Sequence, residues 1–252
     1  MHRSRQSTLS RSSTAAYALT PLGVIQSDYP DKFGVPRQPG LAPAARATLV
    51  LAPPFSDPLA VRGLSAFSHL WLTFIFHQTP QNPERFTPLV RPPRLGGNQK
   101  VGVFASRSPN RPNRLGLSLV TLEKVDTQNG VRLELGGCDL IDQTPVVDIK
   151  PYLPWVEARP DARAGFAPAP PSEVDVVFYP PACALLDQRP DGASLKALIE
   201  QVLRQDPRPA YQRHADGRVY GVRLRDVDVR FQAIEGDAAT ALAVVAIETL
   251  PG

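Results

Sequence analysis

The sequence predicts a mainly β protein with a small α+β unit at its C-terminal end. Proline accounts for 28 of the 252 residues, more than twice its usual share of about 5%, which disfavours long helices over most of the chain. Apolar residues alternate with a period of two in several stretches, as in half-buried strands. The clearest amphipathic helix pattern, Ser194 to Arg204, occurs near the C-terminus.

The strongest strand pattern is the stretch from Ser68 to Gln78. Its alternate residues Leu70, Leu72, Phe74 and Phe76 are all apolar, which predicts one buried face. A second pattern, residues 115–125 and 131–135, predicts two strands joined around Asn129-Gly130, a strong hairpin signal. Further expected elements are strands at 19–27, 47–51 and 101–105 and a short helix at 57–63.

The chain divides into two expected domains. An Ala/Pro/Asp-rich stretch at 159–171 is typical of a linker or a long surface excursion. We therefore expect a disordered tail at 1–16, with an RNA-contacting arm as the alternative, a first domain at 17–158 and a second at 172–252. In the second domain we expect the helix, a strand at 218–232 with a bulge or tight bend at Arg225-Asp226, and a last strand at 241–247.

A basic loop is the most distinctive feature of the first domain. Between Arg85 and Leu122 there are seven basic residues and no acidic residue. Arg107, Arg111 and Arg114 lie on a segment that Pro109 and Pro112 stiffen, and arginine on a stiff loop suits phosphate, nucleobase or carboxylate recognition. The alternative is a solvated basic loop. The net charge of +4 and the pI of about 9.3 permit nucleic-acid binding without proving it.

Two polar pairs have both structural and functional interpretations. Arg37-Gln38 lies between Pro36 and Pro39, so it is held extended and either forms only a rigid loop or grips a polar ligand. His77-Gln78 comes where a strand ends. The histidine there is either a structural hydrogen bonder or part of a site.

An acidic stretch follows the hairpin. Asp139, Asp142, Asp148 and Lys150 lie within twelve residues, separated by apolar ones. The carboxylates can bind a ribose diol, offset a cationic ligand or act as a catalytic pair. Turn aspartates that cap backbone amides are the alternative.

The composition argues against several other classes of protein. Two cysteines and four histidines show no metal-ligand spacing, so we expect no metal site, and the cysteines indicate a reducing, cytoplasmic setting. Because no apolar run of about 18 residues occurs, we expect no transmembrane helix and no membrane partner. The N-terminus has no apolar segment of the secretory type.

Six motifs in order resemble the TsaA/YaeB-type (TrmO) family of S-adenosylmethionine-dependent tRNA methyltransferases. They are Val35 to Gly40, Phe67 to Trp71, Phe76 to Gln78, Arg91 to Asn98, Gly102 to Asn113 and Asp139 to Tyr152. The resemblance covers about residues 17–157, and Asp206 to Tyr211 resembles the longer bacterial members.

The resemblance implies a β-barrel methyltransferase domain, a small C-terminal domain and a homodimer. It implies methyl transfer from S-adenosylmethionine to N6 of N6-threonylcarbamoyladenosine at position 37, beside the anticodon, of a threonine tRNA. The implied partner is the tRNA anticodon loop. The alternatives are a non-catalytic module that binds S-adenosylmethionine or RNA, and a small-molecule methyltransferase.

The resemblance also implies a set of cofactor contacts, whereas the catalytic base stays open. We infer from charge that RNA phosphate or the threonyl carboxylate binds Arg111, Arg114 and Lys150. A base is needed for the N6 proton, and Asp148, His77 and a water are alternatives. The implied cofactor contacts are Pro36, Arg37, Gln38, His77, Gln78, Arg107, Leu119, Asp139, Leu140, Ile141 and Asp142.

Overall fold

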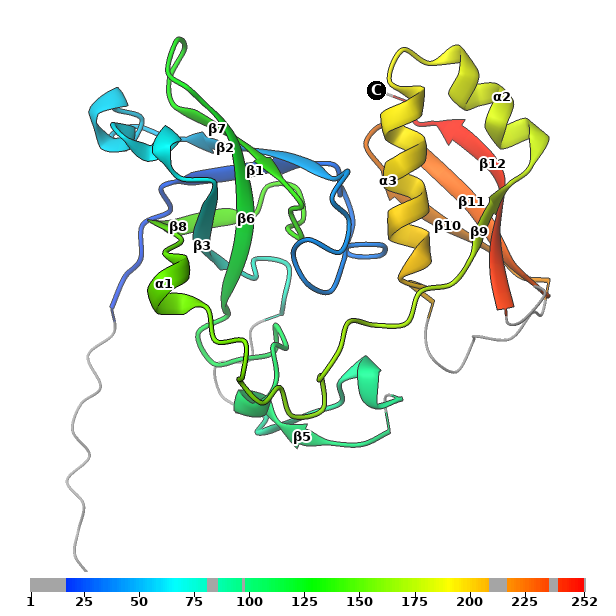
Figure 1. Cartoon of the computed structure of the whole chain (residues 1–252), viewed down its shortest axis with the longest axis horizontal. Helices are drawn as coiled ribbons and strands as arrows, with labels where there is room; N and C mark the ends of the chain where they lie inside the picture. Colours follow the sequence, from blue (N-terminus) through cyan, green and yellow to red (C-terminus); the bar gives the residue numbers. More distant parts are fainter. Residues whose placement is uncertain (1–16, 81–85, 97, 209–216, 236–239, 252) are drawn as a thin grey trace, which may run out of the picture.

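The first part of the chain forms a closed six-stranded antiparallel barrel in the order β1-β2-β7-β6-β3-β8 (Figure 1). The computed structural model describes residues 17–80, 86–96, 98–208, 217–235 and 240–251. The expected tail at 1–16 and part of the Asp206 to Tyr211 motif lie outside these residues. The barrel strands are β1 Gly23–Ser27, β2 Arg46–Leu51, β3 His69–Ile75, β6 Leu115–Asp126, β7 Arg132–Gly136 and β8 Pro145–Pro151.

The predicted alternation is confirmed in the barrel core. Leu70, Leu72 and Phe74 of β3 are at most 5% exposed. They pack with inward-facing residues of the other strands, including Val120 and Leu133. The predicted hairpin is also confirmed, because β6 pairs antiparallel with β7. Burial of such alternating apolar faces is the main stabilising contribution to a barrel of this size.

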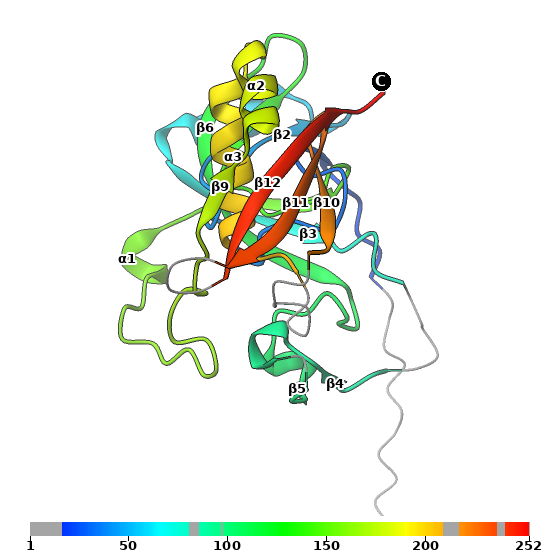
Figure 2. The ribbon, with the colours of Figure 1, turned by 90° about the vertical axis from the view of Figure 1, so that its right-hand side faces the viewer.

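A small projection and several short turns join the barrel strands. The two-stranded sheet pairs β4 (Leu89–Val90) with β5 (Val101–Gly102) (Figure 2). The expected strand 101–105 is therefore wrong in its second half, because Val103–Ala105 forms a 3-10 turn in which the Ser106 amide donates to the Val103 carbonyl. The expected short helix at 57–63 is replaced by two 3-10 turns, Pro58–Val61 and Leu64–Ala66, and a third is Pro93–Leu95.

The C-terminal part forms a four-stranded sheet in the order β10-β11-β12-β9, with helices α2 and α3 packed against it (Figures 1 and 2). The predicted helix and last strand are confirmed. The elements are α1 Pro154–Glu157, which follows the barrel, β9 Val176–Phe178, α2 Pro180–Gln188, α3 Gly192–Arg204, β10 Val219–Leu224, β11 Val227–Glu235 and β12 Thr240–Thr249. In the described residues, no helix is long and apolar enough to cross a membrane.

The strand expected at 218–232 is in fact two strands, and of the two features expected at Arg225-Asp226 the tight bend is confirmed and the bulge is not. The chain reverses at Arg225-Asp226, and Leu224 pairs with Val227 across that turn. Arg225 adopts a positive φ of 53°, the conformation that a tight two-residue hairpin turn requires. The shift in alternation thus marks a hairpin between β10 and β11.

Candidate functional site

One end of the barrel collects the loops that carry the predicted residues. Ile75, the last residue of β3, pairs with Leu115, the first of β6, so His77 and the basic loop leave the barrel at the same end. Strand β8 begins at this end too, because Phe74 near the end of β3 pairs with Val146 near the start of β8. The acidic motif, which precedes β8, therefore lies at this end as well.

Asp139 lies at the centre of this loop cluster. Its carboxylate accepts a hydrogen bond from the Ser118 hydroxyl, which is buried inside the barrel. Burial raises the pKa of Asp139 to about 6, and Ser118 and the nearby positive charge of Arg107 oppose that rise. A carboxyl group held this way changes its charge readily when a cation approaches.

Arg107 joins the basic loop to the loop after β1. Its guanidinium donates to the side-chain carbonyl of Gln38, and the Gln38 amide donates to the Arg37 carbonyl. Pro36, just before this pair, is buried, whereas Arg37 and Arg107 are exposed. The structure thus brings the predicted residue Arg107 to the Arg37-Gln38 pair, 69 residues away from Gln38 in the sequence.

The strand-end pair His77-Gln78 joins the same cluster. Lys32 donates its ammonium hydrogen to the Gln78 carbonyl. Burial and the charge of Lys32 lower the pKa of His77, and Asp142 partly opposes them. The imidazole is therefore mainly neutral at neutral pH and able to accept a proton.

Asp142 is held by the first strand rather than by the basic loop. Its carboxylate accepts a hydrogen bond from the Ser27 amide at 3.0 Å, and its own amide donates to the Tyr29 carbonyl at 2.8 Å. Leu140 is buried and Ile141 half-buried, so these two residues anchor the motif between its acids. The acidic motif is a rigid corner of the barrel.

Three of the predicted residues lie along the strands rather than in the loop cluster. Leu119 pairs with Trp71 in the middle of the β3-β6 ladder. Asp148 pairs with Thr73 on β8, accepts a hydrogen bond from the Ile149 amide and forms an ion pair with Lys150. The predicted roles of these residues stay predictions.

The remaining arginines of the basic loop bind backbone carbonyls of the protein. Arg111 donates to the carbonyls of Ser106 and Ser108. Arg114 adopts a positive φ of 51°, and its side chain donates to the Thr79 carbonyl at 3.3 Å. These bonds stiffen the loop and tie it to the end of β3. That both arginines also contact RNA stays a prediction.

Sequence reasoning missed three residues at or near the site. Ser118 had a usable signal, since a hydroxyl stands on the otherwise apolar inward face of β6. Leu117 and Phe104 are 52% and 72% exposed, and nothing in the alternation marks them. Leu117 lies on the same face as Leu119, two residue pairs nearer to the loop cluster.

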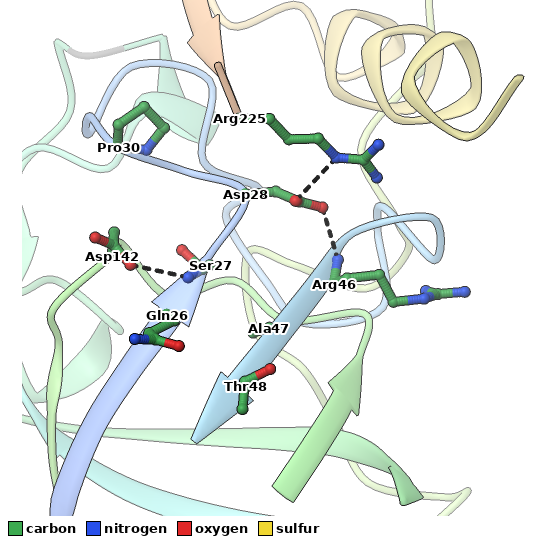
Figure 3. Close-up of a pocket in the computed structure, with 9 residues that line it drawn as sticks. All are labelled: Gln26, Ser27, Asp28, Pro30, Arg46, Ala47, Thr48, Asp142 and Arg225. Atoms are coloured by element: carbon green, nitrogen blue, oxygen red, sulfur yellow. Dashed lines mark hydrogen bonds and ion pairs between the residues drawn. The ribbon is translucent and has the colours of Figure 1, made fainter. Parts of the chain in front are cut away.

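A cleft of about 430 Å³ lies next to the loop cluster and shares Ser27 and Asp142 with it (Figure 3). Its charged groups bind one another: the Asp28 carboxylate accepts from the Arg225 guanidinium at 3.0 Å and from the Arg46 amide at 2.8 Å. Polar groups satisfied in this way have little left to offer a ligand. We therefore place the site at the loop cluster and not in this cleft.

The comparisons with known proteins cover nearly all of this architecture. The model of the tRNA-methyltransferase O N-terminal domain matches residues 24–158, and that of the TrmO C-terminal domain matches residues 171–249. The tRNA (adenine(37)-N6)-methyltransferase of Escherichia coli K12 is 48% identical over 225 residues, which is 88% of this chain and 95% of that protein.

Two further matches, both from Pseudomonas aeruginosa, agree with this one. The protein with the name "Putative S-adenosylmethionine-dependent methyltransferase RcsF" is 49% identical over 219 residues, which is 85% of this chain and 92% of that protein. The crystal structure of TrmO from that organism superposes with a TM-score of 0.75 at 40% identity and covers 93% of this chain and 99% of its own.

The barrel, its loop cluster and these matches define an S-adenosylmethionine-dependent methyltransferase that does not use a Rossmann-type domain. Both family models match, and together they span most of the described sequence. The chain belongs to the TrmO family.

Proposed function

We propose that this protein transfers a methyl group from S-adenosylmethionine to N6 of adenosine 37 in tRNA, and that the accepted base is N6-threonylcarbamoyladenosine in threonine tRNA. The observation that carries the proposal is the meeting of Gln38, Arg107 and Asp139 at one end of the barrel. Relatives that bear the name tRNA (adenine(37)-N6)-methyltransferase support the position of the base.

The charged and polar side chains of the loop cluster fit the functional groups of S-adenosylmethionine. Its sulfonium and amino groups are cationic, and Asp139 and Asp142 supply negative charge to offset them. Its carboxylate suits the guanidinium of Arg37 or Arg107, with the Gln38 amide alongside. The exposed Leu117 and the half-buried Leu119 offer apolar surface for the adenine ring.

The chemistry asks the protein mainly for positioning. S-adenosylmethionine, when bound, supplies a methyl group already activated by its sulfonium. The new bond joins the N6 nitrogen to the methyl carbon as the carbon–sulfur bond breaks, and the sulfur retains the electron pair as a thioether. Stiffened loops hold Gln38 and Arg107 in place, and such positioning can lower a barrier by about 7–11 kcal/mol.

The N6 proton must leave during or after attack, because N6 carries a carbamoyl group and little basicity. We propose His77 as its acceptor in preference to Asp148. His77 lies in the loop cluster with a lowered pKa, so its imidazole is free to take a proton. Asp148 lies on β8, where Lys150 neutralises it.

The basic loop is the proposed contact with the anticodon loop. Arg111 and Arg114 keep hydrogen bonds to the protein, and each guanidinium has further donors for a phosphate or for the threonyl carboxylate. Lys150 is exposed on β8, and Trp155 of α1 is 82% exposed. An exposed aromatic ring suits stacking with an unpaired base.

The proposal also covers the oligomeric state, the cellular location and the domain boundaries. We propose a homodimer, and the exposed apolar side chains of Phe86, Leu89 and Phe104 near the β4–β5 projection support it. We propose a cytoplasmic location, which suits a tRNA substrate. The two cysteines, Cys138 and Cys183, are not disulfide-bonded, as expected in a reducing compartment. The domain boundaries near 158 and 172 are part of the same proposal.

The acceptor is tested by methyl transfer from radiolabelled S-adenosylmethionine to two forms of threonine tRNA, one carrying the threonylcarbamoyl group on adenosine 37 and one lacking it. We expect label only in the modified form, because the threonyl carboxylate is the anion that the arginines recognise. Equal labelling of both forms would contradict that specificity. Cofactor binding without label in either form would favour a non-catalytic binding module.

A further inference from the structure

The loop between β1 and β2, residues 28–45, belongs to two parts of the molecule at once. It leaves the barrel after Ser27, carries the proposed cofactor residues Pro36, Arg37 and Gln38, and returns to the barrel at Arg46. Its other side chains pack into the C-terminal unit. We call this segment the β1–β2 loop.

The apolar residues of the β1–β2 loop are part of the C-terminal core. Tyr29, Ala42 and Ala45 are at most 1% exposed and cluster with the buried residues of α3, β10 and β11. Phe33 stacks on Phe231 of β11, with ring centroids 6.5 Å apart and planes 13° from parallel. The loop therefore cannot move far without exposing part of that core.

Gly34 makes the closest approach, two residues before Pro36. It has a φ of +91°, and a Cβ added there would lie 2.3 Å from a methyl carbon of Val222 on β10 and 3.5 Å from one of Val202 on α3. Val222 is itself 1% exposed and has no room to withdraw. Glycine is needed here both for the backbone conformation and for the space.

Polar contacts fix the same loop at both ends. Arg225, in the turn between β10 and β11, binds Asp28 at 3.0 Å. The Arg223 guanidinium on β10 lies 3.7 Å from the Asp31 carboxylate. The side-chain carbonyl of Gln201 on α3 accepts a hydrogen bond from the Ala44 amide at 2.7 Å. Elements of the C-terminal unit thus contact the loop on both sides of its proposed cofactor residues.

We infer that the C-terminal unit positions the cofactor residues of the β1–β2 loop, with Val222 and Phe231 as the positioning residues and Gly34 as the point of contact. The unit is then required for binding S-adenosylmethionine, although its strands carry no proposed cofactor contact. The inference rests on the proposed function, because it assumes that Pro36, Arg37 and Gln38 bind the cofactor.

The test measures the affinity of the full-length protein for S-adenosylmethionine by calorimetry and for tRNA by filter binding. In Gly34→Ala the new methyl group pushes the loop away from Val222, and we expect the cofactor affinity to fall about tenfold or more, since small displacements of positioning groups have large effects. The tRNA affinity should stay unchanged. The KM for the cofactor should rise while the KM for tRNA does not.

A matched control separates crowding from backbone strain. Gly63 has a φ of +83° and nothing within 4 Å of an added Cβ. It lies between two 3-10 turns, outside the proposed site. Gly63→Ala therefore carries similar backbone strain without the contact, and it should retain the cofactor affinity of the wild type.

A rescue variant makes the inference sharper. Val222→Ala removes the methyl groups that an alanine at position 34 would meet but not the backbone strain there, so the double variant Gly34→Ala/Val222→Ala should recover part of the cofactor affinity. Wild-type affinity in Gly34→Ala, or no recovery in the double variant, would overturn the inference. Should Gly34→Ala fail to fold, Phe33→Leu, which loses the ring stack on Phe231, must weaken cofactor binding without weakening tRNA binding.

Arg37→Ala, measured in parallel, distinguishes this inference from the proposed function. If Arg37→Ala binds the cofactor as the wild type does, the assignment of the loop to the cofactor is wrong. If Arg37→Ala loses affinity and Gly34→Ala does not, only the role of the C-terminal unit is wrong.

Discussion

Arg107→Ala is expected to lower kcat/KM for methyl transfer about 100-fold, which corresponds to about 2.7 kcal/mol of lost transition-state stabilisation. Arg107 is the side chain that joins the basic loop to Gln38, and its charge acts on Asp139. Removal of the Arg107 guanidinium breaks the link between the basic loop and Gln38 and takes a cation away from the Asp139 carboxyl group. Initial rates at varied concentrations of S-adenosylmethionine and of tRNA measure the effect.

Arg107→Lys shows whether the planar guanidinium of Arg107 is needed or only its positive charge, and Arg132→Ala serves as the control. Arg107→Lys keeps the charge but not the planar pair of donors, so we expect an intermediate rate. Arg132 is an exposed arginine at the first position of β7, away from the loop cluster. Arg132→Ala should leave the rate unchanged. A rate for Arg107→Ala equal to that of Arg132→Ala would contradict the role of Arg107.

Asp139→Asn is expected to stabilise the protein at neutral pH and not at acid pH. Burial raises the pKa of Asp139 to about 6 in the folded protein, above the value in the unfolded chain. At pH values between the unfolded and the folded pKa of Asp139, the carboxyl group has lost its proton in the unfolded chain but keeps it in the folded protein. The unfolded state is therefore favoured progressively, and the wild type loses stability as the pH rises through this range. The free energy of unfolding of the variant should exceed that of the wild type by up to about 3 kcal/mol above pH 6 or so, and by little near pH 4.

Denaturant unfolding of both proteins at several pH values measures this difference. Asp161→Asn changes an exposed carboxylate and serves as the control. If the difference in free energy of unfolding between Asp139→Asn and the wild type is constant with pH, or shrinks as the pH rises, the raised pKa of Asp139 is contradicted. Cofactor binding gives a second readout: the affinity of the wild type should increase from pH 5 to 7, because the cation favours the ionised Asp139, and that of Asp139→Asn should not.

Five of the six barrel strands could be predicted from the sequence because each has one buried face, whereas β8 was missed inside the acidic stretch. In β3, the buried Leu70, Leu72 and Phe74 alternate with half-buried residues. In β7, the buried Leu133 and Leu135 alternate with the exposed Arg132 and the half-buried Glu134. Closure of the barrel does not follow from alternation, since it requires β1 to pair with β8, more than a hundred residues away. The family resemblance, not the pattern, gave the expectation of a barrel.

The missed elements are those in which local signals conflict. Helix α2 begins at Pro180-Pro181, and two adjacent prolines usually indicate a loop, although proline is tolerated in the first turn of a helix. The turn at Arg225-Asp226 contains neither glycine nor asparagine, so the shift in alternation predicted a bulge or a tight bend without distinguishing them. Arg225 is held there by ion pairs with Asp28 and Asp191, which are tertiary contacts.

For the candidate site, the sequence predicted which residues take part but not how they contact one another. The residue types at Arg37-Gln38, Arg107 and Asp139 to Asp142 could be read from the motifs. Their contacts could not, because these depend on which loops leave the barrel at the same end. The packing of the β1–β2 loop into the C-terminal core was also beyond sequence reasoning, since Tyr29 and Phe33 lie far in the sequence from the residues that bury them.

The most direct test of the central claim is a crystal structure of the protein with S-adenosylmethionine bound. We predict that the cofactor lies at the end of the barrel among Gln38, Arg107 and the Asp139 to Asp142 motif, with its sulfonium facing the Asp139 carboxylate. Binding instead in the cleft between Arg46 and Arg225 (Figure 3) would contradict the account of the site.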